Sequence, residues 1–470
     1  MLAPVAVLAF VSGCTGEPRA EAGAETEGGE SDESGESGES GTGADTGETG
    51  VDAAPTYWKD TKLILDAACV SCHRAGEVAP FTLEGWDEVQ NFAPVLAGAI
   101  SDRSMPPWPP RAGCNEFAND RSLGEEEREI LLDWIDQGYP EGDPADAPPE
   151  PELPEDFEPD FSVQLPVPYT PNGELDDYRC FTIPWPESLT EDSYVVGQEV
   201  IPDQRDAVHH VITYVAGPGE SAFYQNLDDA DPEPGYTCFG GPGKLDWSAR
   251  WLGDWVPGAE RWLAPAGTGV RVEAGSLLVV QIHYNNAGGE PLPDQTRLDF
   301  QVVDEVEHVG EFVPIVNYGW ITGSTSMSIP AGAPDTSHSV TLGRTDPLIQ
   351  FLTVGLGVAP NETVDVWRAA LHMHTLGTRA ELTLERAEAE AEDECMLGID
   401  DWDFNWQGDY LMREPQAFGP GDAIRLECHW DNSAGNQPMV DGQPKVPTDV
   451  GWGDGTFDEM CLGIVYLARR

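Results

Sequence analysis

Basic residues are scarce in this sequence. It holds 24 Lys and Arg against 85 Asp and Glu, which gives a formal net charge of −61 at pH 7. Nucleic-acid binding depends on clustered Lys and Arg that neutralise phosphates, so the composition argues against a nucleic-acid partner. Acidity on this scale indicates a strongly solvated surface.

The apolar stretch at residues 2–14 is shorter than the roughly 20 residues that cross a bilayer. It fits the apolar region of a signal peptide. Its end, Val11-Ser12-Gly13-Cys14, is similar to the lipobox of bacterial lipoproteins, in which the cysteine is lipidated. We predict a signal peptide with a lipobox over residues 1–14; an ordinary secretory signal is the alternative. Because Thr15 rather than Asp follows the cysteine, we expect an exported protein of the bacterial cell envelope, lipid-anchored at the outer membrane or surface.

Two segments lack the residues that form a core. Residues 15–54 consist largely of Glu, Gly, Ser and Thr, and residues 143–165 are rich in Pro and acidic side chains. Neither composition buries enough apolar surface to offset the entropy lost on ordering. We therefore predict a disordered acidic linker over 15–54 and an extended Pro- and acid-rich linker over 143–165.

Histidine is also rare, yet five of the nine histidines fall in three strand-like contexts. His372 and His374, in AALHMHTLG, are two residues apart and so leave a strand on the same face. His283 lies in VVQIHYNN. His209 and His210, in AVHHVITYVAG, are adjacent and can share a metal only where the strand twists or bulges. A lone histidine is more often a core residue, but this grouping predicts metal binding.

A different motif lies in residues 55–142. Cys69, Cys72 and His73 form C-x-x-C-H, the attachment signature of c-type haem. Met105, in RSMPPWPP, is placed to be the second axial ligand, and Met/His ligation suits an electron carrier. A redox CxxC and half of a zinc site are the alternatives, although the sequence has no second CxxC.

The same segment ends in a predicted helix. In EEEREILLDWIDQGY, the apolar residues Ile130, Leu131, Trp134 and Ile135 recur at helical spacing, and Gly138 ends the pattern. Together with the haem motif, these residues resemble a small α-helical cytochrome c domain over 55–142, and this helix is similar to that family's C-terminal helix.

From residue 166 onward the sequence is typical of β-structure. Short runs rich in β-branched and aromatic residues are separated by Gly, Pro, Asn and Asp, and no helical run of comparable strength is present. We predict a mainly β protein with two tandem β-sandwich or jelly-roll domains, over 166–305 and 306–470.

The ordered motifs H-H, Q-x-H-Y, H-x-H-x-L-G and E-M-C resemble those of the copper type II, ascorbate-dependent monooxygenases. This family includes peptidylglycine α-hydroxylating monooxygenase and dopamine β-monooxygenase, and the resemblance covers residues 166–470. It implies an electron-donating copper in the first domain and an oxygen-activating copper in the second, facing each other across an open cleft. It also implies hydroxylation of an unactivated C–H bond with O2.

Carried over by motif, the resemblance assigns a ligand set to each copper. The set for the first copper is His209, His210 and His283, and the set for the second, oxygen-activating copper is His372, His374 and Met460. A thioether beside imidazoles favours copper, notably Cu(I).

The resemblance also implies two disulfides. Cys180 would pair with Cys238, and Cys428 with Cys461. Export permits such bonds. Cys114 and Cys395 stay without an assigned partner.

Three positions depart from the peptidylglycine enzymes. Ala370 stands where those enzymes carry an arginine that holds the substrate carboxylate, and Leu462 and Ile464 stand where they carry Asn and Tyr. The clamp for a peptide carboxylate is therefore missing. We expect a more apolar pocket and a small organic substrate.

The combined prediction is a copper-dependent monooxygenase with two coppers and one haem c. Its electrons would come from ascorbate or a periplasmic donor, with the fused haem passing them to the first copper and then to the second. The alternative is a non-catalytic copper-binding or electron-transfer envelope lipoprotein. A zinc hydrolase is a third interpretation, but its H-E-x-x-H pattern is absent.

Overall fold

The computed structural model describes residues 54–75, 79–149, 157–244, 248–257, 259, 261–286, 290–388, 391–440 and 442–470. The predicted signal peptide, lipobox and acidic linker up to residue 53 lie outside these ranges, as do residues 150–156 of the second linker. Residues Ala54–Arg470 form one compact unit. Within the described residues, every helix is too short or too polar to cross a membrane.

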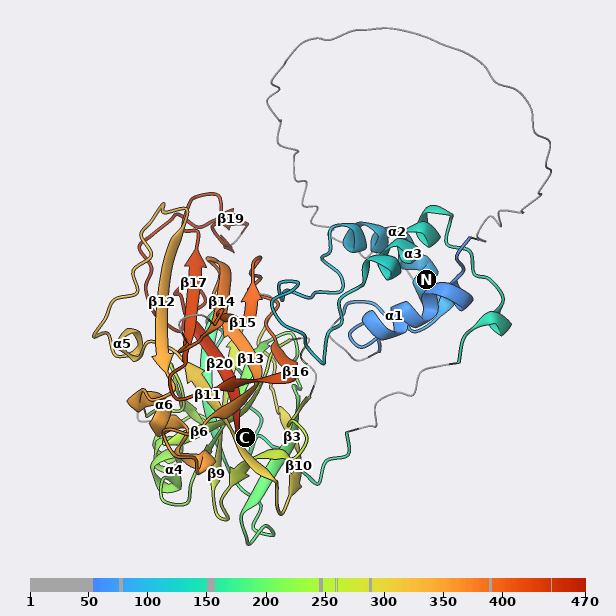
Figure 1. Cartoon of the computed structure of the whole chain (residues 1–470). Coiled ribbons are helices and arrows are strands. Elements are labelled where there is room, and N and C mark those ends of the chain that lie inside the picture. The colour runs from blue at the N-terminus through green and yellow to red at the C-terminus, as the bar shows by residue number, and fades with distance from the viewer. Residues whose placement is uncertain are drawn as a thin grey trace, which may run out of the picture. The chain divides into compact units, whose positions relative to one another are not determined.

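The described chain begins with helices, drawn in blue and teal in Figure 1. They are η1 (Tyr57–Thr61), α1 (Lys62–Ala68), α2 (Trp86–Ser101), α3 (Glu125–Asp136) and η2 (Pro144–Asp146). Helix α3 confirms the predicted helix: Leu131 and Trp134 are fully buried, and Gly138 has a φ of 82° just past its end. The Glu127 carboxylate accepts a hydrogen bond from the Gly124 backbone N–H at 2.9 Å, which satisfies a free donor at the helix start.

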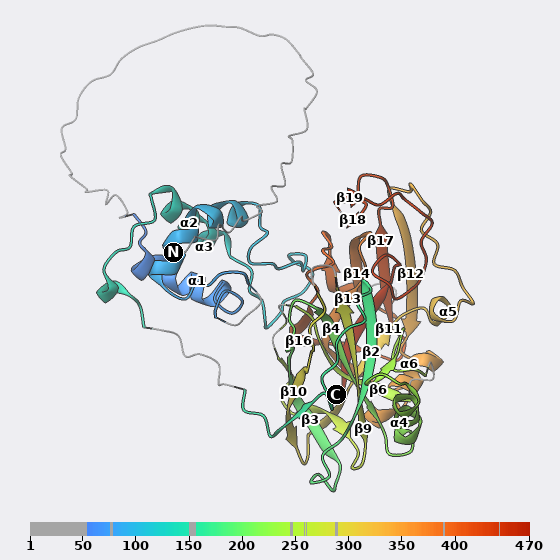
Figure 2. The same ribbon diagram turned by 180° about the vertical axis from the view of Figure 1, so that it is seen from behind.

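The remainder is mainly β, as predicted, and its strands form several sheets (Figures 1 and 2). The largest sheet has the order β1 (Phe161–Gln164), β10 (Arg297–Val303), β3 (Ser193–Ile201), β8 (Thr268–Val272), β11 (His308–Ile315), β20 (Leu462–Arg469), β13 (Val364–His372) and β16 (Asp409–Phe418), with β7 (Trp262–Leu263) beside β3. A five-stranded sheet has the order β5 (Tyr236–Thr237), β2 (Asp176–Pro184), β9 (Leu277–Asn285), β4 (Val208–Ala216) and β6 (Ala249–Trp255). A four-stranded sheet has the order β12 (Thr336–Gly343), β17 (Ala423–Trp430), β14 (Gly377–Glu385) and β15 (Glu394–Ile399), and β18 (Met439–Val440) pairs with β19 (Gln443–Pro444).

The largest sheet runs through both predicted β-domains. β8 and β11 pair in parallel, with His308 opposite Thr268, and this pairing joins strands from before and after residue 305. Each side nevertheless has its own hydrophobic core. One core gathers residues mainly from 165–300, and the other gathers residues mainly from 313–467. The two halves are therefore separate in packing but continuous in backbone hydrogen bonding.

Three helices in this region differ from the sequence prediction. They are α4 (Ser221–Ala230), α5 (Tyr318–Ile321) and α6 (Pro347–Leu352), followed by the single turn η3 (Val354–Leu356). In both views α4 and α6 lie side by side (Figures 1 and 2). In α4 the one fully buried side chain is Tyr224, and the helix is polar overall, so its composition does not mark it as a core helix. Helix α6 depends on a local cap, in which Asp346 accepts from the Leu348 N–H at 2.9 Å.

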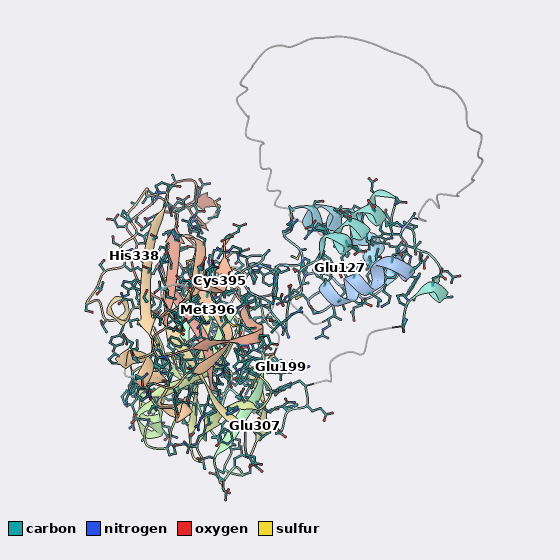
Figure 3. The ribbon with its side chains drawn as sticks, viewed as in Figure 1. Glu127, Glu199, Glu307, His338, Cys395 and Met396 are labelled. Carbon is teal, nitrogen blue, oxygen red and sulfur yellow. A yellow bond between two sulfur atoms is a disulfide. The ribbon has the colours of Figure 1, made fainter. Side chains whose placement is uncertain are left out.

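A segment that we call the strap, Pro107–Arg121, crosses from the helices to the β-structure. The strap is covalently fixed, because Cys114 forms a disulfide with Cys395 (labelled in Figure 3), which lies on the edge strand β15. This bond pairs the two cysteines that the sequence left unassigned. Arg111 adds ion pairs to Glu381 at 2.5 Å and to Asp400 at 3.0 Å, although partly exposed pairs of this kind contribute little stability.

The strap also enters the core. Phe117 is 3% exposed and belongs to the second core, and its backbone forms a bridge with Met412. The other two disulfides, Cys180–Cys238 and Cys428–Cys461, confirm the pairs implied by the resemblance.

Replacing both Cys114 and Cys395 by Ser should release the strap. Because this disulfide closes a loop across a sequence separation of 281 residues, its loss should lower the free energy of unfolding by about 2–5 kcal/mol. Limited trypsin digestion at Arg111 and Arg121, followed by mass spectrometry, should show faster cleavage. A matched control is the Cys69→Ser/Cys72→Ser pair, produced without haem, which leaves all three disulfides intact. Equal digestion rates in the two variants would show that the disulfide does not hold the strap.

Candidate metal centres

The first cluster joins His209 and His210 of β4 to His283 of β9. One ligand atom from each of the three lies within 4.8 Å of the others. The pairing register of β4 with β9 shifts between Val208 and His210, and this irregularity turns two adjacent side chains toward one point. The bulge that the sequence required is present.

All three histidines of this cluster have a buried Nδ1 atom without a hydrogen-bond partner. Burial lowers the pKa of His209 to about 3 and also lowers the pKa values of His210 and His283. The rings are therefore neutral, which is the form that binds a metal. Unsatisfied buried nitrogens are costly, and a shared metal ion would satisfy all three. The residues present fit a copper or zinc ion.

Asp176 orients His283. The His283 Nε2 atom donates to Asp176 Oδ1 at 2.8 Å, which leaves Nδ1 free to face the cluster. The same carboxylate accepts hydrogen bonds from the backbone N–H and the hydroxyl of Thr456, at 2.9 and 2.6 Å. Tyr178 stacks on the His283 ring with centroids 4.0 Å apart. A carboxylate behind a ligand histidine is a common way to fix its tautomer and orientation.

The second cluster lies at the end of β13. The ring centroids of His372 and His374 are 5.1 Å apart. His372 Nδ1 donates to Gln407 Oε1 at 2.6 Å, and His374 Nδ1 donates to the Asp458 carbonyl at 3.1 Å. Both rings therefore keep Nε2 free, and burial lowers both pKa values, that of His372 to about 4. Met460 lines the same cavity as His372, and its role as the third ligand of this cluster stays a prediction.

Glu459 fixes the position of Met460. Its fully buried carboxylate accepts hydrogen bonds from the backbone N–H groups of His374 and Leu376, at 2.9 and 2.6 Å, and from the Trp430 indole at 2.8 Å. Burial raises the pKa of Glu459 to about 7. These bonds tie the loop that carries Met460 to the turn that carries His374.

The two clusters lie close together, whereas the resemblance implied that an open cleft would separate them. The ring centroids of His210 and His372 are 6.2 Å apart. Phe404 stacks on His209 with centroids 4.7 Å apart and lies 6.0 Å from the ring of His374. An aromatic side chain therefore occupies space that an open cleft would leave to solvent.

A cavity of about 140 Å³ is bordered by both clusters. Three of the predicted ligands line it, His210, His372 and Met460, and its walls include Ile212, Tyr214, Trp251, Trp255, Val316, Ile321 and Trp452. Ala370, Leu462 and Ile464 also line it. All three departures from the peptidylglycine enzymes are thus at the cavity, which has an apolar wall where an arginine would stand.

Two acidic side chains interrupt the apolar lining. Burial and the charge of Asp409 raise the pKa of Asp254 to about 7. Burial and the charge of Asp458 raise the pKa of Asp454 to about 6, and its buried Oδ1 has no hydrogen-bond partner. A neutral carboxyl group at either position can serve as a hydrogen-bond donor to a polar group in the cavity.

The C-x-x-C-H residues carry the side chains that haem attachment uses, and the attachment itself stays a prediction. Cys69 and Cys72 are free, half-buried thiols. His73 is nearly buried, and its Nδ1 atom donates to the Phe81 carbonyl at 3.0 Å, which leaves Nε2 free. Met105 lies just beyond the end of α2, and its role as the second axial ligand stays a prediction.

No family model matches the chain. The chain is similar to DBH-like monooxygenase protein 1 of chicken, with 24% identity over 279 residues (57% of this chain and 40% of the relative). It is similar also to the mouse protein of that name, with 24% identity over 315 residues (64% and 46%), and to the human protein, with 23% over 271 residues (56% and 39%). The chain thus spans less than half the length of these relatives.

These relatives support the dopamine β-monooxygenase-like family. Among solved structures, the major capsid protein P2 of bacteriophage PM2 matches with 9% identity and a TM-score of 0.23, covering 66% of this chain and 97% of that one. A score this low carries no argument about fold or function.

Four residues of the site were missed from the sequence. They are Asp176, Phe404, Gln407 and Glu459. Glu459 had a local signal, since it belongs to the E-M-C motif. The other three lie far in sequence from the histidines they contact, or follow no recognisable pattern.

Replacing Asp176 by Ala should weaken the first cluster. Without the carboxylate His283 loses its fixed orientation, and we expect copper affinity there to fall about 10- to 100-fold. Competition with a Cu(I) chelator measures this affinity. Asp192→Ala is the control, because Asp192 pairs with Arg271 and contacts none of the five histidines. Unchanged affinity in Asp176→Ala would show that the carboxylate does not support the site.

Proposed function

We propose that the chain is a copper-dependent monooxygenase that hydroxylates a C–H bond of a small organic substrate with O2. The observation that carries this proposal is the shared cavity, which His210 of the first cluster borders together with His372 and Met460 of the second. The similarity to DBH-like monooxygenases supports the same reaction class.

Each cluster has its own role in this proposal. His209, His210 and His283 would hold an electron-donating copper, and His372, His374 and Met460 would hold a copper at which O2 reacts. Copper, when bound, supplies one-electron redox chemistry and the activation of O2. The Met460 thioether is a soft ligand that favours Cu(I).

The chain itself provides orientation and exclusion of water. The aromatic and aliphatic cavity walls hold an apolar substrate body beside His372 and Met460. Gln407 and the Asp458 carbonyl fix both imidazoles, so that the free nitrogens face the reaction site. Glu459 keeps Met460 in place. Ala370, Leu462 and Ile464 provide no partner for a peptide carboxylate, which favours a small organic substrate over a peptide.

The haem c and the location of the protein complete the proposal. Cys69, Cys72, His73 and Met105 would hold haem c, whose iron would pass on electrons from ascorbate or a periplasmic donor. The protein would be exported and held at the bacterial envelope by a lipid on Cys14. Three disulfides support an oxidising compartment.

Replacing Met460 by Ile should separate a monooxygenase from a copper carrier. Loss of the thioether should weaken Cu(I) binding at the second cluster and reduce reductant-driven oxygen uptake at least 100-fold, with the haem spectrum unchanged. Oxygen uptake and hydroxylated product are measured together over a panel of small aromatic and aliphatic compounds. Met439→Ile is the matched control, because Met439 is 64% exposed and lies outside the cavity. A wild-type protein that binds two coppers but hydroxylates none of the panel would favour the non-catalytic copper lipoprotein.

A further inference from the structure

One loop contacts both histidine clusters. We call it the junction loop, Asp403–Gly408, and it lies between β15 and β16. Its Phe404 stacks on His209, and its Gln407 accepts a hydrogen bond from His372 Nδ1 at 2.6 Å. Gln407 Nε2 also donates to the Phe404 carbonyl at 2.9 Å. The two contacts are therefore linked within four residues.

The strap reaches the same loop on its other side. A second cavity, which we call the strap cavity, has a volume of about 20 Å³. It is lined by residues of the strap, of the junction loop and of β16: Pro107, Trp108, Pro109, Arg121, Trp406, Gln407, Gly408 and Tyr410. This volume accommodates about one water molecule. Trp108 packs edge-to-face against Tyr410 with centroids 5.3 Å apart. Gln407 thus borders the strap cavity and bonds to a histidine of the second cluster.

The strap cavity also adjoins the haem motif. The Arg121 guanidinium, which lines the cavity, has its Nη1 atom 4.0 Å from Cys72 Sγ. Cys72 is therefore separated from His372 by Arg121, one small cavity and Gln407. The Cys114–Cys395 disulfide and Phe117 hold the strap in this place.

We infer that the strap cavity and the junction loop form a port for electrons. Electrons from a haem held at Cys69, Cys72 and His73 would pass through this port directly to the second cluster, and not by way of the first cluster. The inference rests on the proposed function. Each transfer would move one electron, from a ferrous haem held by Cys69, Cys72 and His73 to a Cu(II) ion held by His372 and His374, which would leave ferric haem and Cu(I). No bond forms or breaks and no proton moves. The external donor then reduces the ferric iron again.

The contacts favour the second cluster as the acceptor. Electron tunnelling decays less across covalent and hydrogen bonds than across van der Waals gaps. From the strap cavity, Gln407 leads to His372 through a hydrogen bond of 2.6 Å. His209 is reached from this loop through the stacking contact of Phe404, which does not line the strap cavity.

The test uses the full chain with haem and Cu(II), kept anaerobic. A laser flash on a photosensitised reductant reduces the haem, and its reoxidation is followed by the α-band while freeze-quench EPR follows the Cu(II) signals. In His209→Ala/His210→Ala, which removes the first copper, reoxidation should persist within about threefold. In Gln407→Leu and in Trp108→Ala it should slow at least tenfold. Asn405→Leu, at an exposed position of the same loop, is the matched control and should match the wild type.

The outcomes separate the port from the proposed function. Copper content shows whether Gln407→Leu retains the second copper, and Trp108→Ala tests the route without touching a histidine. Reoxidation that disappears with the first copper but survives in Trp108→Ala would overturn the port. A haem that stays reduced in the wild type, while ascorbate still drives oxygen uptake and hydroxylation, would also overturn the port and leave the monooxygenase standing.

Discussion

The structure depends on keeping five imidazoles neutral, each with at least one ring nitrogen free of a hydrogen bond. For three of the five histidines the protein provides an oxygen partner for one nitrogen: Asp176 for His283, Gln407 for His372 and the Asp458 carbonyl for His374. The choice of nitrogen differs between the clusters, with Nδ1 free in His283 and Nε2 free in the other two. Leaving buried nitrogens without partners destabilises an empty site, so a metal ion bound here would stabilise the fold.

Besides the pairing of β8 with β11, the loop 454–459 links the two halves of the β-structure beside the histidine clusters. Tyr178 on β2 donates to the Asp454 carbonyl at 2.7 Å, and Asp176 on the same strand accepts from Thr456. A few residues later Glu459 binds the backbone of His374. A displacement of this loop would therefore disturb the support of His283 and the position of Met460 together. The short distance between the clusters follows from these bonds and from Phe404.

Much of this arrangement could be predicted from local sequence. The histidine contexts predicted strands, and the adjacent pair His209 and His210 required the bulge that is present. The helix over Glu125–Asp136 followed from its apolar spacing and acidic start. What could not be predicted depends on distant contacts: Cys114 and Cys395 are 281 residues apart, and Asp176 meets Thr456 across 280 residues. The helix α4 was missed because it is short and polar overall, with one fully buried side chain, and lies among stronger strand patterns.

The strap joins the helical segment that carries the C-x-x-C-H motif to the β-structure at a second point, in addition to the connection to β1. The chain passes from the helices into the strap at residue 107, returns to form α3, and re-enters the β-structure at β1. A single flexible linker raises the effective concentration of a donor but leaves its orientation free. A disulfide on the strap, with Phe117 in the core, instead fixes which residues approach the junction loop. Since tunnelling depends steeply on distance, fixing Arg121 and Trp108 beside Gln407 would limit any transfer from a haem to one route more effectively than a longer or more acidic linker would.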